Sequence, residues 1–317
     1  MGEENPARVT VLGDVNLEVT GVIAPRFGAL TGDHLTSAPL KVHVGGTAAN
    51  FAIAARAHFR WVRLVGVVGT DEQGSWAESA LRSCGIDTRL FRSPGRPTGT
   101  VVAIRDGGTQ RGSRLMIASP GSANSALTSD HIASSGDILA DTDFIVADGY
   151  SLLSEPRRSA VLEAMRRGSR AGAHVVLDLV PHHLETLISH EELRVWLTYA
   201  SIVVCEAATA RGLLGLPLPS GPLQLPEARE TAEHLARAFP GRAFLLRFGF
   251  ANIDQSLIRH PDGESTHHFT GFSEATDTYA FGDRLTAREI ADHFTDHHHR
   301  TAGQGERRED RPPQPTH

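Results

Sequence analysis

The sequence predicts an α/β fold in which a doubly wound parallel sheet is accompanied by a second, smaller β-sheet. Between residues 144 and 248, short apolar runs alternate with helix-length segments, which is the pattern of consecutive βαβ units. Two early stretches, at about 15–44 and 88–118, read instead as short strands and turns that form a separate small sheet. A chain of 317 residues is long enough for one large α/β domain or two small ones.

Apolar runs and turn residues give the expected elements of the N-terminal half. Buried strands are expected at 9–14 and 63–69, and a helix at 71–81 that ends at Cys84-Gly85. Gly45-Gly46 forms a turn before a helical run at 51–56. The strands 100–104 and 114–118 flank a glycine-containing turn, which predicts a β-hairpin.

The C-terminal half contains the regular alternation. Strands are expected at 144–147, 174–179, 201–205 and 243–248, and helices at 156–168, 191–198, 227–238 and 285–294. From residue 297 the chain becomes polar and rich in proline, which predicts a disordered tail at 297–317. The triplet His297-His298-His299 in this tail reads as a solvated run, with adventitious metal binding as the alternative.

Composition narrows the class of protein. A formal charge of −6 without a basic block argues against nucleic acid as a partner. Lys41 is the only lysine, so no G-x-x-x-x-G-K-[ST] phosphate loop can exist. The chain has neither an apolar leader nor a run of eighteen apolar residues, which predicts a cytoplasmic protein with no membrane partner. Cys84 and Cys205 are isolated thiols, expected as reduced core residues rather than a disulfide.

Two short motifs have the residue types of a binding site. Gly282-Asp283 opens the last expected helix, where backbone N–H groups and the helix dipole favour an anion and an aspartate can accept a proton from an attacking hydroxyl. Gly45-Gly46 with Asn50 suits a small polar ligand, because glycine permits close approach and the amide can bond hydroxyls. A simple turn remains the alternative for Gly45-Gly46.

Taken in order, these motifs resemble the PfkB/ribokinase family of carbohydrate and nucleoside kinases, and the resemblance runs from about Val9 to Asp283. The motifs that carry it are Gly13-Asp14 with Glu18, Gly45-Gly46 with Asn50, Gly66-x-x-Gly69-x-Asp71-x-x-Gly74, Gly85-Ile86-Asp87, Pro97-Thr98-Gly99-Thr100, Gly121-Ser122-Ala123-Asn124, and Asp277-Thr278 to Gly282-Asp283. The resemblance implies one ribokinase-like domain at 1–296, with a Rossmann-like core and a β-sheet lid built from the two early stretches.

The same resemblance implies the roles of individual residues, with ATP and Mg²⁺ as cofactors. Asp283 becomes the base that deprotonates the acceptor hydroxyl, and Gly282 becomes part of the anion hole for the γ-phosphoryl group. No residue is assigned as a metal ligand. The substrate side is formed by Asp14, Glu18, Gly45, Gly46, Asn50 and Asn124, and the nucleotide side by Arg247, Gly249, Ala280 and Phe281.

Departures from the family pattern concentrate on the nucleotide side. Ala280 replaces a glycine and is strained if that position needs a positive φ, and Phe281 places an aromatic ring near the phosphate path. Arg247 replaces a small hydroxyl residue and can pair with phosphates. Glu206 stands where the family has an N-x-x-E element; it either substitutes for that element or lies on the surface, and the surface position is the expectation. Glu18 is one methylene longer than the usual aspartate, which indicates a shifted or smaller substrate.

These observations leave three hypotheses. The leading one is ATP-dependent phosphorylation of a hydroxyl on a small sugar or nucleoside-like substrate, with a homodimer through the lid as an option. The alternative is a pseudokinase that binds a sugar-like ligand without phosphoryl transfer. A nicotinamide-dependent oxidoreductase is disfavoured, because no G-x-G-x-x-G follows the first strand.

Overall fold

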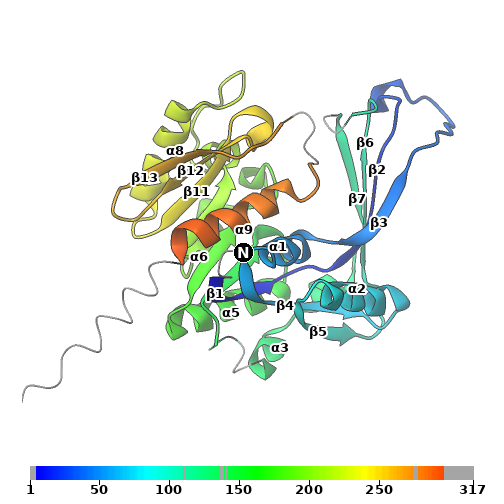
Figure 1. Cartoon of the computed structure of the whole chain (residues 1–317), viewed down its shortest axis with the longest axis horizontal. Coiled ribbons are helices and arrows are strands. Elements are labelled where there is room, and N and C mark those ends of the chain that lie inside the picture. The colour runs from blue at the N-terminus through cyan, green and yellow to red at the C-terminus, as the bar shows by residue number, and fades with distance from the viewer. Residues whose placement is uncertain (1–4, 110–111, 136–138, 140, 274–277, 296–317) are drawn as a thin grey trace, which may run out of the picture.

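The structure, a computed structural model, describes residues 5–109, 112–135, 139, 141–273 and 278–295 (Figure 1). Among these residues, nine strands form a large and mostly parallel sheet, and four strands form a second sheet. The predicted α/β class with a small second sheet is therefore confirmed. Asp277 and the tail at 297–317 lie outside the described residues.

The large sheet has the strand order β13-β12-β11-β10-β9-β8-β1-β4-β5 in the described part of the chain. Its consecutive parallel strands are β5 (Asp87–Ser93), β4 (Phe59–Gly69), β1 (Asn5–Leu12), β8 (Phe144–Asp148), β9 (His174–Asp178), β10 (Ile202–Glu206) and β11 (Ala243–Phe248). Because these strands run in one direction, their carboxyl ends meet at a single edge, where ligands of such folds bind.

An antiparallel hairpin extends the sheet beyond β11, and it was not expected from the sequence. It consists of β12 (Gln255–Arg259) and β13 (Ser265–Phe269), joined by the turn at His260–Glu264. Each strand is five residues long, and β13 has a polar sequence, STHHF. Such short, polar runs lack the apolar signal of a buried strand.

Helices cover both faces of the large sheet, as the doubly wound prediction requires. Along β10, Val203 and Cys205 face one core and Val204 faces the other. The first core is closed by α3 (Ser129–Ser134), α5 (Arg157–Ala171), α6 (His190–Leu197), α7 (Ala207–Leu213) and α8 (Leu225–Ala238). The second is closed by α1 (Thr47–Ala55), α2 (Glu72–Ser83) and α9 (Phe281–Phe294). Figure 1 shows α9 lying beside α1.

The small sheet has the strand order β3-β2-β6-β7 and projects from the main body (Figure 1). Its strands are β3 (Leu40–Gly45), β2 (Asn16–Val22), β6 (Gly99–Arg105) and β7 (Arg114–Ala118), and β6 and β7 form the predicted hairpin. The boundary expected at residue 88 was wrong, because β5 pairs in parallel with β4 at the edge of the large sheet. Strand β5 follows α2 as the third part of a βαβ unit, so the second segment of the small sheet begins at Gly99.

Two further expectations can be compared with the structure. Both cysteines are free, and Cys205 is buried as expected, but Cys84 is exposed at the end of α2, so its core assignment was wrong. The helix expected at 71–81 is α2, and Asp71 is its N-cap residue, because Asp71 Oδ1 accepts a hydrogen bond from the Gly74 N–H. No helix among the described residues is long and apolar enough to cross a membrane.

Candidate active site

A cleft of about 1300 Å³ lies where the small sheet faces the carboxyl ends of the parallel strands. Its walls come from the end of β1, from β9, β10 and β11, from the small sheet, and from the first turn of α9. Most of the predicted site residues line this cleft: Asp14, Glu18, Gly46, Asn50, Asn124, Arg247, Ala280, Phe281, Gly282 and Asp283. The structure thus brings together residues that are up to 269 positions apart (283 − 14) in the sequence.

The N-terminus of α9 opens into the cleft. Ala280 is its N-cap residue, with φ 48° and ψ 24°, and no side chain caps the helix. This left-handed conformation is strained for a residue with a Cβ, as expected if alanine replaces a glycine at this position. Because Gly282 and Asp283 belong to the first helical turn, their N–H groups are not used within the helix and can face an anion.

Asp283 lines the cleft from this first turn. Burial raises the pKa of its carboxyl well above the usual aspartate value, and the neighbouring carboxylate of Asp178 raises this pKa further. The guanidinium of Arg247 opposes the rise. A carboxylate with a raised pKa is a stronger base than an ordinary surface aspartate.

The guanidinium of Arg247 packs against the start of α9. Its Nη2 donates to Asp178 Oδ1 at 3.0 Å and its Nη1 donates to Thr286 Oγ1 at 3.4 Å, and both members of the ion pair are buried. A Cβ added to Gly282 would lie only 2.8 Å from Arg247 Nη1. The guanidinium is therefore held by Asp178, and glycine at 282 lets the helix approach it closely.

On the predicted substrate side, hydrogen bonds through Asn16 connect Asp14 to Asn124. Asp14 accepts hydrogen bonds from the Ala48 N–H at 3.2 Å and from Asn16 Nδ2 at 3.0 Å. Asn124 donates to Asn16 Oδ1 at 2.6 Å and accepts from the Val15 N–H at 3.0 Å. Asn16 was missed in the sequence, since it occupies an ordinary strand position and belongs to no motif.

Glu18 is anchored by the glycine turn. Its Oε1 accepts from the Gly46 N–H at 2.8 Å, and a Cβ on Gly45 would collide with its carboxyl carbon at 2.2 Å. Gly45 therefore leaves room for Glu18 and does not itself line the cleft. The pKa of Glu18 is raised, because the effect of burial exceeds the opposing effect of the hydrogen bond from the Gly46 N–H.

Tyr279 also lines the cleft, beside the predicted substrate side, and was not predicted as a site residue from the sequence. Its hydroxyl donates to Asn50 Oδ1 at 2.7 Å, and its ring packs edge-on against His43 at a centroid distance of 4.3 Å. Burial, followed by the nearby charge of Glu18, raises the pKa of this phenol. Asn50 Oδ1 is therefore already hydrogen-bonded to Tyr279, and the phenol of Tyr279 lies among the predicted substrate-binding residues.

The predicted nucleotide side contains an aromatic cluster. Phe272 lies 5.3 Å from Phe281 and 6.4 Å from Phe250 between ring centroids, and all three rings line the cleft. Gly249 does not line it; its φ of 84° shapes the turn that presents Phe250 and Asn252.

Glu206 lies in the cleft, so its expected surface position was wrong. Its side chain is 13% exposed, and Oε2 lies 3.1 Å from His182 Nδ1 and accepts from Asn252 Nδ2 at 3.2 Å. The Glu206 side chain is largely buried because it lies at the carboxyl end of β10, between the ends of the neighbouring strands β9 and β11. Asp178, His182 and Asn252 were also missed, although an acidic residue at the end of a predicted parallel strand is a usable signal.

Comparison with known proteins identifies the family. Residues 7–246 match the family described as pfkB family carbohydrate kinase. The chain therefore belongs to the pfkB family. The matched segment ends before α9, so it does not include Gly282 and Asp283.

Individual relatives cover only part of the chain. The 2-dehydro-3-deoxygluconokinase of Thermoproteus tenax is 34% identical over 165 residues, which are 46% of this chain and 50% of that protein. The fructokinase of Vibrio alginolyticus is 29% identical over 137 residues, 42% of each chain. The chain thus spans about half the length of the curated relatives it matches.

Solved structures confirm the ribokinase-like fold. Ribokinase from Giardia lamblia superimposes with a TM-score of 0.70 at 17% identity, covering 90% of this chain and 82% of that chain. Fructokinase with bound ATP from Xylella fastidiosa gives 0.67 at 18% identity, with the same coverage. At such identities the similarity concerns the fold.

Proposed function

We propose that this protein transfers the γ-phosphoryl group of ATP to a hydroxyl of a small sugar, with Asp283 as the base. The observation that carries the proposal is the position of Asp283 in the uncapped first turn of α9, facing the cleft that also holds Asp14 and Glu18. The acceptor hydroxyl gives its proton to the Asp283 carboxylate while its oxygen forms a bond to phosphorus and ADP leaves. The N–H groups of the first turn stabilise the charge on the transferred group.

The cofactors of this reaction fit the residues at the nucleotide side. Mg²⁺ prefers oxygen ligands and is usually held by one or two carboxylates together with phosphates; Glu206, with its carboxylate in the cleft, is the residue that would hold it. Bound Mg²⁺ would neutralise phosphate charge. The cluster of Phe250, Phe272 and Phe281 offers apolar ring surfaces to the adenine.

The cleft also favours a class of acceptor. Two cationic side chains of the small sheet line the cleft, Lys41 from β3 and Arg114 from β7. A carboxylated sugar offers such cations an ionic contact that a neutral pentose does not. Two relatives are named for such compounds, the 2-dehydro-3-deoxygluconokinase above and a 5-dehydro-2-deoxygluconokinase of Bacillus subtilis. A sugar acid is therefore the first acceptor to test, ahead of neutral sugars and nucleosides.

The test measures ADP release with ATP, Mg²⁺ and a panel of sugar acids, pentoses, hexoses and nucleosides. The wild type should release ADP only with an acceptor, and Asp283→Asn should lower kcat by about 10²–10⁴-fold because the proton acceptor is lost. Asp292→Asn, an exposed position on the same helix, is the matched control and should keep wild-type activity. An active wild type whose Asp283→Asn variant is equally active would remove Asp283 from the mechanism.

A pseudokinase that binds a sugar-like ligand is the second candidate. Three observations favour it: the left-handed Ala280, the ring of Phe281 at the helix start, and the engagement of Arg247 by Asp178. A ligand that binds only the folded state raises its melting temperature. Under this reading a sugar raises Tm, ATP does not, and no acceptor produces ADP. A rise in Tm with ATP and Mg²⁺ contradicts it.

We also propose that two copies of the chain pair through the small sheet. Strand register divides this sheet into a face that lines the cleft and an opposite, outer face. The outer face is aliphatic and consists of Val19, Leu40, Val42, Val102, Ile104, Leu115 and Ile117. Of these, Leu40 and Val42 are 59% and 57% exposed. A second copy is the occupant that such a face fits best, because identical aliphatic rows complement each other across a two-fold axis.

We place the protein in the cytoplasm, because the proposed reaction uses ATP as its phosphoryl donor.

A further inference from the structure

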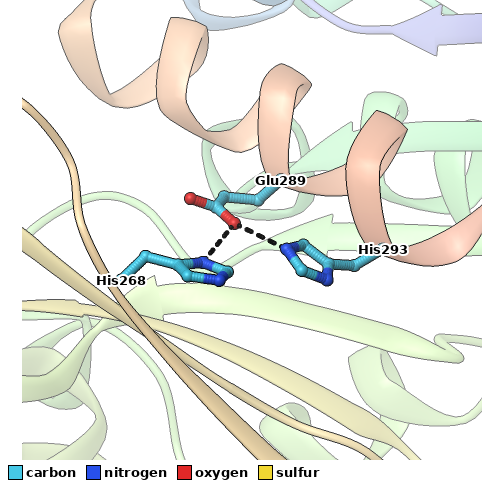
Figure 2. Close-up of side chains that lie close together, drawn as sticks. All are labelled: His268, Glu289 and His293. Carbon is cyan, nitrogen blue, oxygen red and sulfur yellow. Dashed lines mark hydrogen bonds and ion pairs between the residues drawn. The ribbon is translucent and has the colours of Figure 1, made fainter.

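Three side chains with metal-ligating atoms converge where β13 lies against α9. His268 comes from β13, and Glu289 and His293 come from successive turns of α9 (Figure 2). His268 Nδ1 lies 3.0 Å from Glu289 Oε2, and His293 Nε2 lies 3.4 Å from the same oxygen. None of the three lines the cleft, so the cluster is separate from the candidate active site.

The distances within this cluster match the coordination shell of a small divalent cation. Tetrahedral zinc with Zn–N and Zn–O bonds of about 2.0–2.1 Å has ligand atoms about 3.3 Å apart. The two N···O distances, 3.0 and 3.4 Å, bracket this value. The two nitrogens lie within 4.8 Å of each other, so the N···N edge is the one that can shorten when a cation binds.

The carboxylate of Glu289 is oriented by contacts to its other oxygen. Ser256 Oγ and Arg288 Nη2 both donate to Oε1, each at 3.2 Å, and the Glu289 side chain is 2% exposed. These contacts leave Oε2 to the two imidazoles. Outer contacts of this kind fix the ligand atoms of protein metal sites.

The histidines leave room for a further ligand. Their side chains are 31% and 23% exposed, yet both turn a nitrogen toward the same buried oxygen. Their rings stack with a centroid distance of 4.8 Å, so both imidazoles approach Oε2 from one side (Figure 2). A water molecule could complete a four-coordinate shell from the solvent side.

We propose that His268, Glu289 and His293 bind one Zn²⁺ ion, with water as the fourth ligand. Zinc is the best match among common cations, because it accepts a mixed imidazole and carboxylate set in tetrahedral geometry, whereas Mg²⁺ and Ca²⁺ prefer oxygen ligands. The ion joins β13 to α9, the helix whose first turn contains Gly282 and Asp283. Its expected effect is to hold α9 against the β12–β13 hairpin.

The test uses the full chain with His297, His298 and His299 replaced by alanine, because this tail triplet could bind zinc by itself. Calorimetric titration with Zn²⁺ alone should give one site per chain, and zinc should raise Tm. His268→Ala or His293→Ala should weaken binding at least about 100-fold, since removal of even an outer-shell partner costs about 10–100-fold.

The matched control is His267→Ala, the adjacent histidine of β13. Its Nε2 pairs with Gln255 Oε1 at 2.9 Å, and its ring lies 5.8 Å from that of Phe248, so it belongs to different surroundings. This variant should keep the wild-type zinc affinity. Absence of one-to-one binding, or equal weakening by His267→Ala and His268→Ala, overturns the proposal.

A second measurement covers variants that fail to fold. Co²⁺ added to the chain without the tail triplet should produce the visible absorption of four-coordinate cobalt, and Zn²⁺ should displace it. If this spectrum is missing, the site does not exist, whatever the stability of the variants.

Discussion

Ala280 carries the clearest local strain at the candidate site. Its φ of 48° is costly for a residue with a Cβ and easy for glycine. Ala280→Gly should therefore raise the free energy of unfolding by about 0.5–1 kcal/mol, because the relieved strain exceeds the entropy that glycine adds to the unfolded chain. Urea denaturation at constant pH measures this difference.

Ala291→Gly is the control for that measurement, since it makes the same substitution within α9. There the backbone is helical, and glycine should lower stability by about 1 kcal/mol. The two variants should thus change stability in opposite directions. Destabilisation by Ala280→Gly would mean that the left-handed conformation is not strained.

Asp148 makes stability depend on pH. Burial and the nearby Asp14 raise the pKa of its carboxyl to about 7. Between the unfolded value of 3.8 and about 7, the folded state therefore binds more protons than the unfolded state, so this carboxyl lowers stability as pH rises through that window. Above about pH 7 this carboxyl is ionised in both states, and its contribution to stability no longer changes with pH.

Asp148→Asn should remove this dependence. The amide oxygen can still accept from the Ser151 N–H, as Asp148 Oδ1 does at 2.9 Å. Relative to wild type, the variant should gain about 4 kcal/mol between pH 4 and pH 8, because each pKa unit corresponds to about 1.4 kcal/mol; urea denaturation at several pH values measures this gain. The exposed Asp262→Asn should show no such gain, and a pH-independent difference for Asp148→Asn would contradict the assignment.

Residues that belong to contiguous motifs could be predicted from the sequence, and residues placed by the fold could not. Asp14 and Asn50 follow glycine turns, and the strain at Ala280 was expected from the residue type alone. Tyr279 lies in a recognised motif, but its contact with Asn50 spans 229 positions and depends on how α9 meets α1. The pairing of Arg247 with Asp178 depends equally on the order of β9, β10 and β11.

Among the elements, α9 is the one on which the proposed reaction depends, because its first turn contains Gly282 and Asp283. Its first turn rests on the guanidinium of Arg247, and a Cβ at Gly282 would approach Nη1 to 2.8 Å. Asp178 holds that guanidinium in place, so the helix is the part that must move in Gly282→Ala. We expect kcat to fall about 10–100-fold with little loss of stability, because a displacement of about 1 Å at a reacting group has an effect of this size.

The comparison variant for Gly282→Ala is Gly28→Ala, where an added Cβ meets nothing within 4 Å. Steady-state kinetics with whichever acceptor of the panel supports ADP release should show wild-type kcat for Gly28→Ala. Full activity in Gly282→Ala would show that the close approach of α9 to Arg247 is unnecessary for catalysis.

Long elements with a strong apolar signal were predictable, and their pairing was less so. The strands β8 to β11 match the expected ranges to within one or two residues, since buried parallel strands are continuous apolar runs. Strand β5 was assigned to the wrong sheet, because apolar alternation does not reveal which neighbour a strand pairs with. The β12–β13 hairpin was not predicted, because its strands are short and β13 is polar. This hairpin contributes His268 to the zinc site proposed above.

At the scale of the whole molecule, strand register gives the small sheet two different faces. One face lines the cleft, and the aliphatic outer face points away from it. Neighbouring residues of β7 therefore have different roles: Ile117 lies on the outer face and Met116 lines the cleft, although they are 57% and 48% exposed. This pair allows the proposed dimer to be tested within a single strand.

Light scattering should give a mass of twice 34.1 kDa for the wild type. Ile117→Lys should weaken the dimer at least about 100-fold, because the two-fold axis places two desolvated charges in an aliphatic interface. Met116→Lys adds the same charge on the cleft face, so it should remain dimeric and alter acceptor binding instead. A monomeric wild type, or equal loss of dimer in both variants, would show that the outer face does not bind a second copy.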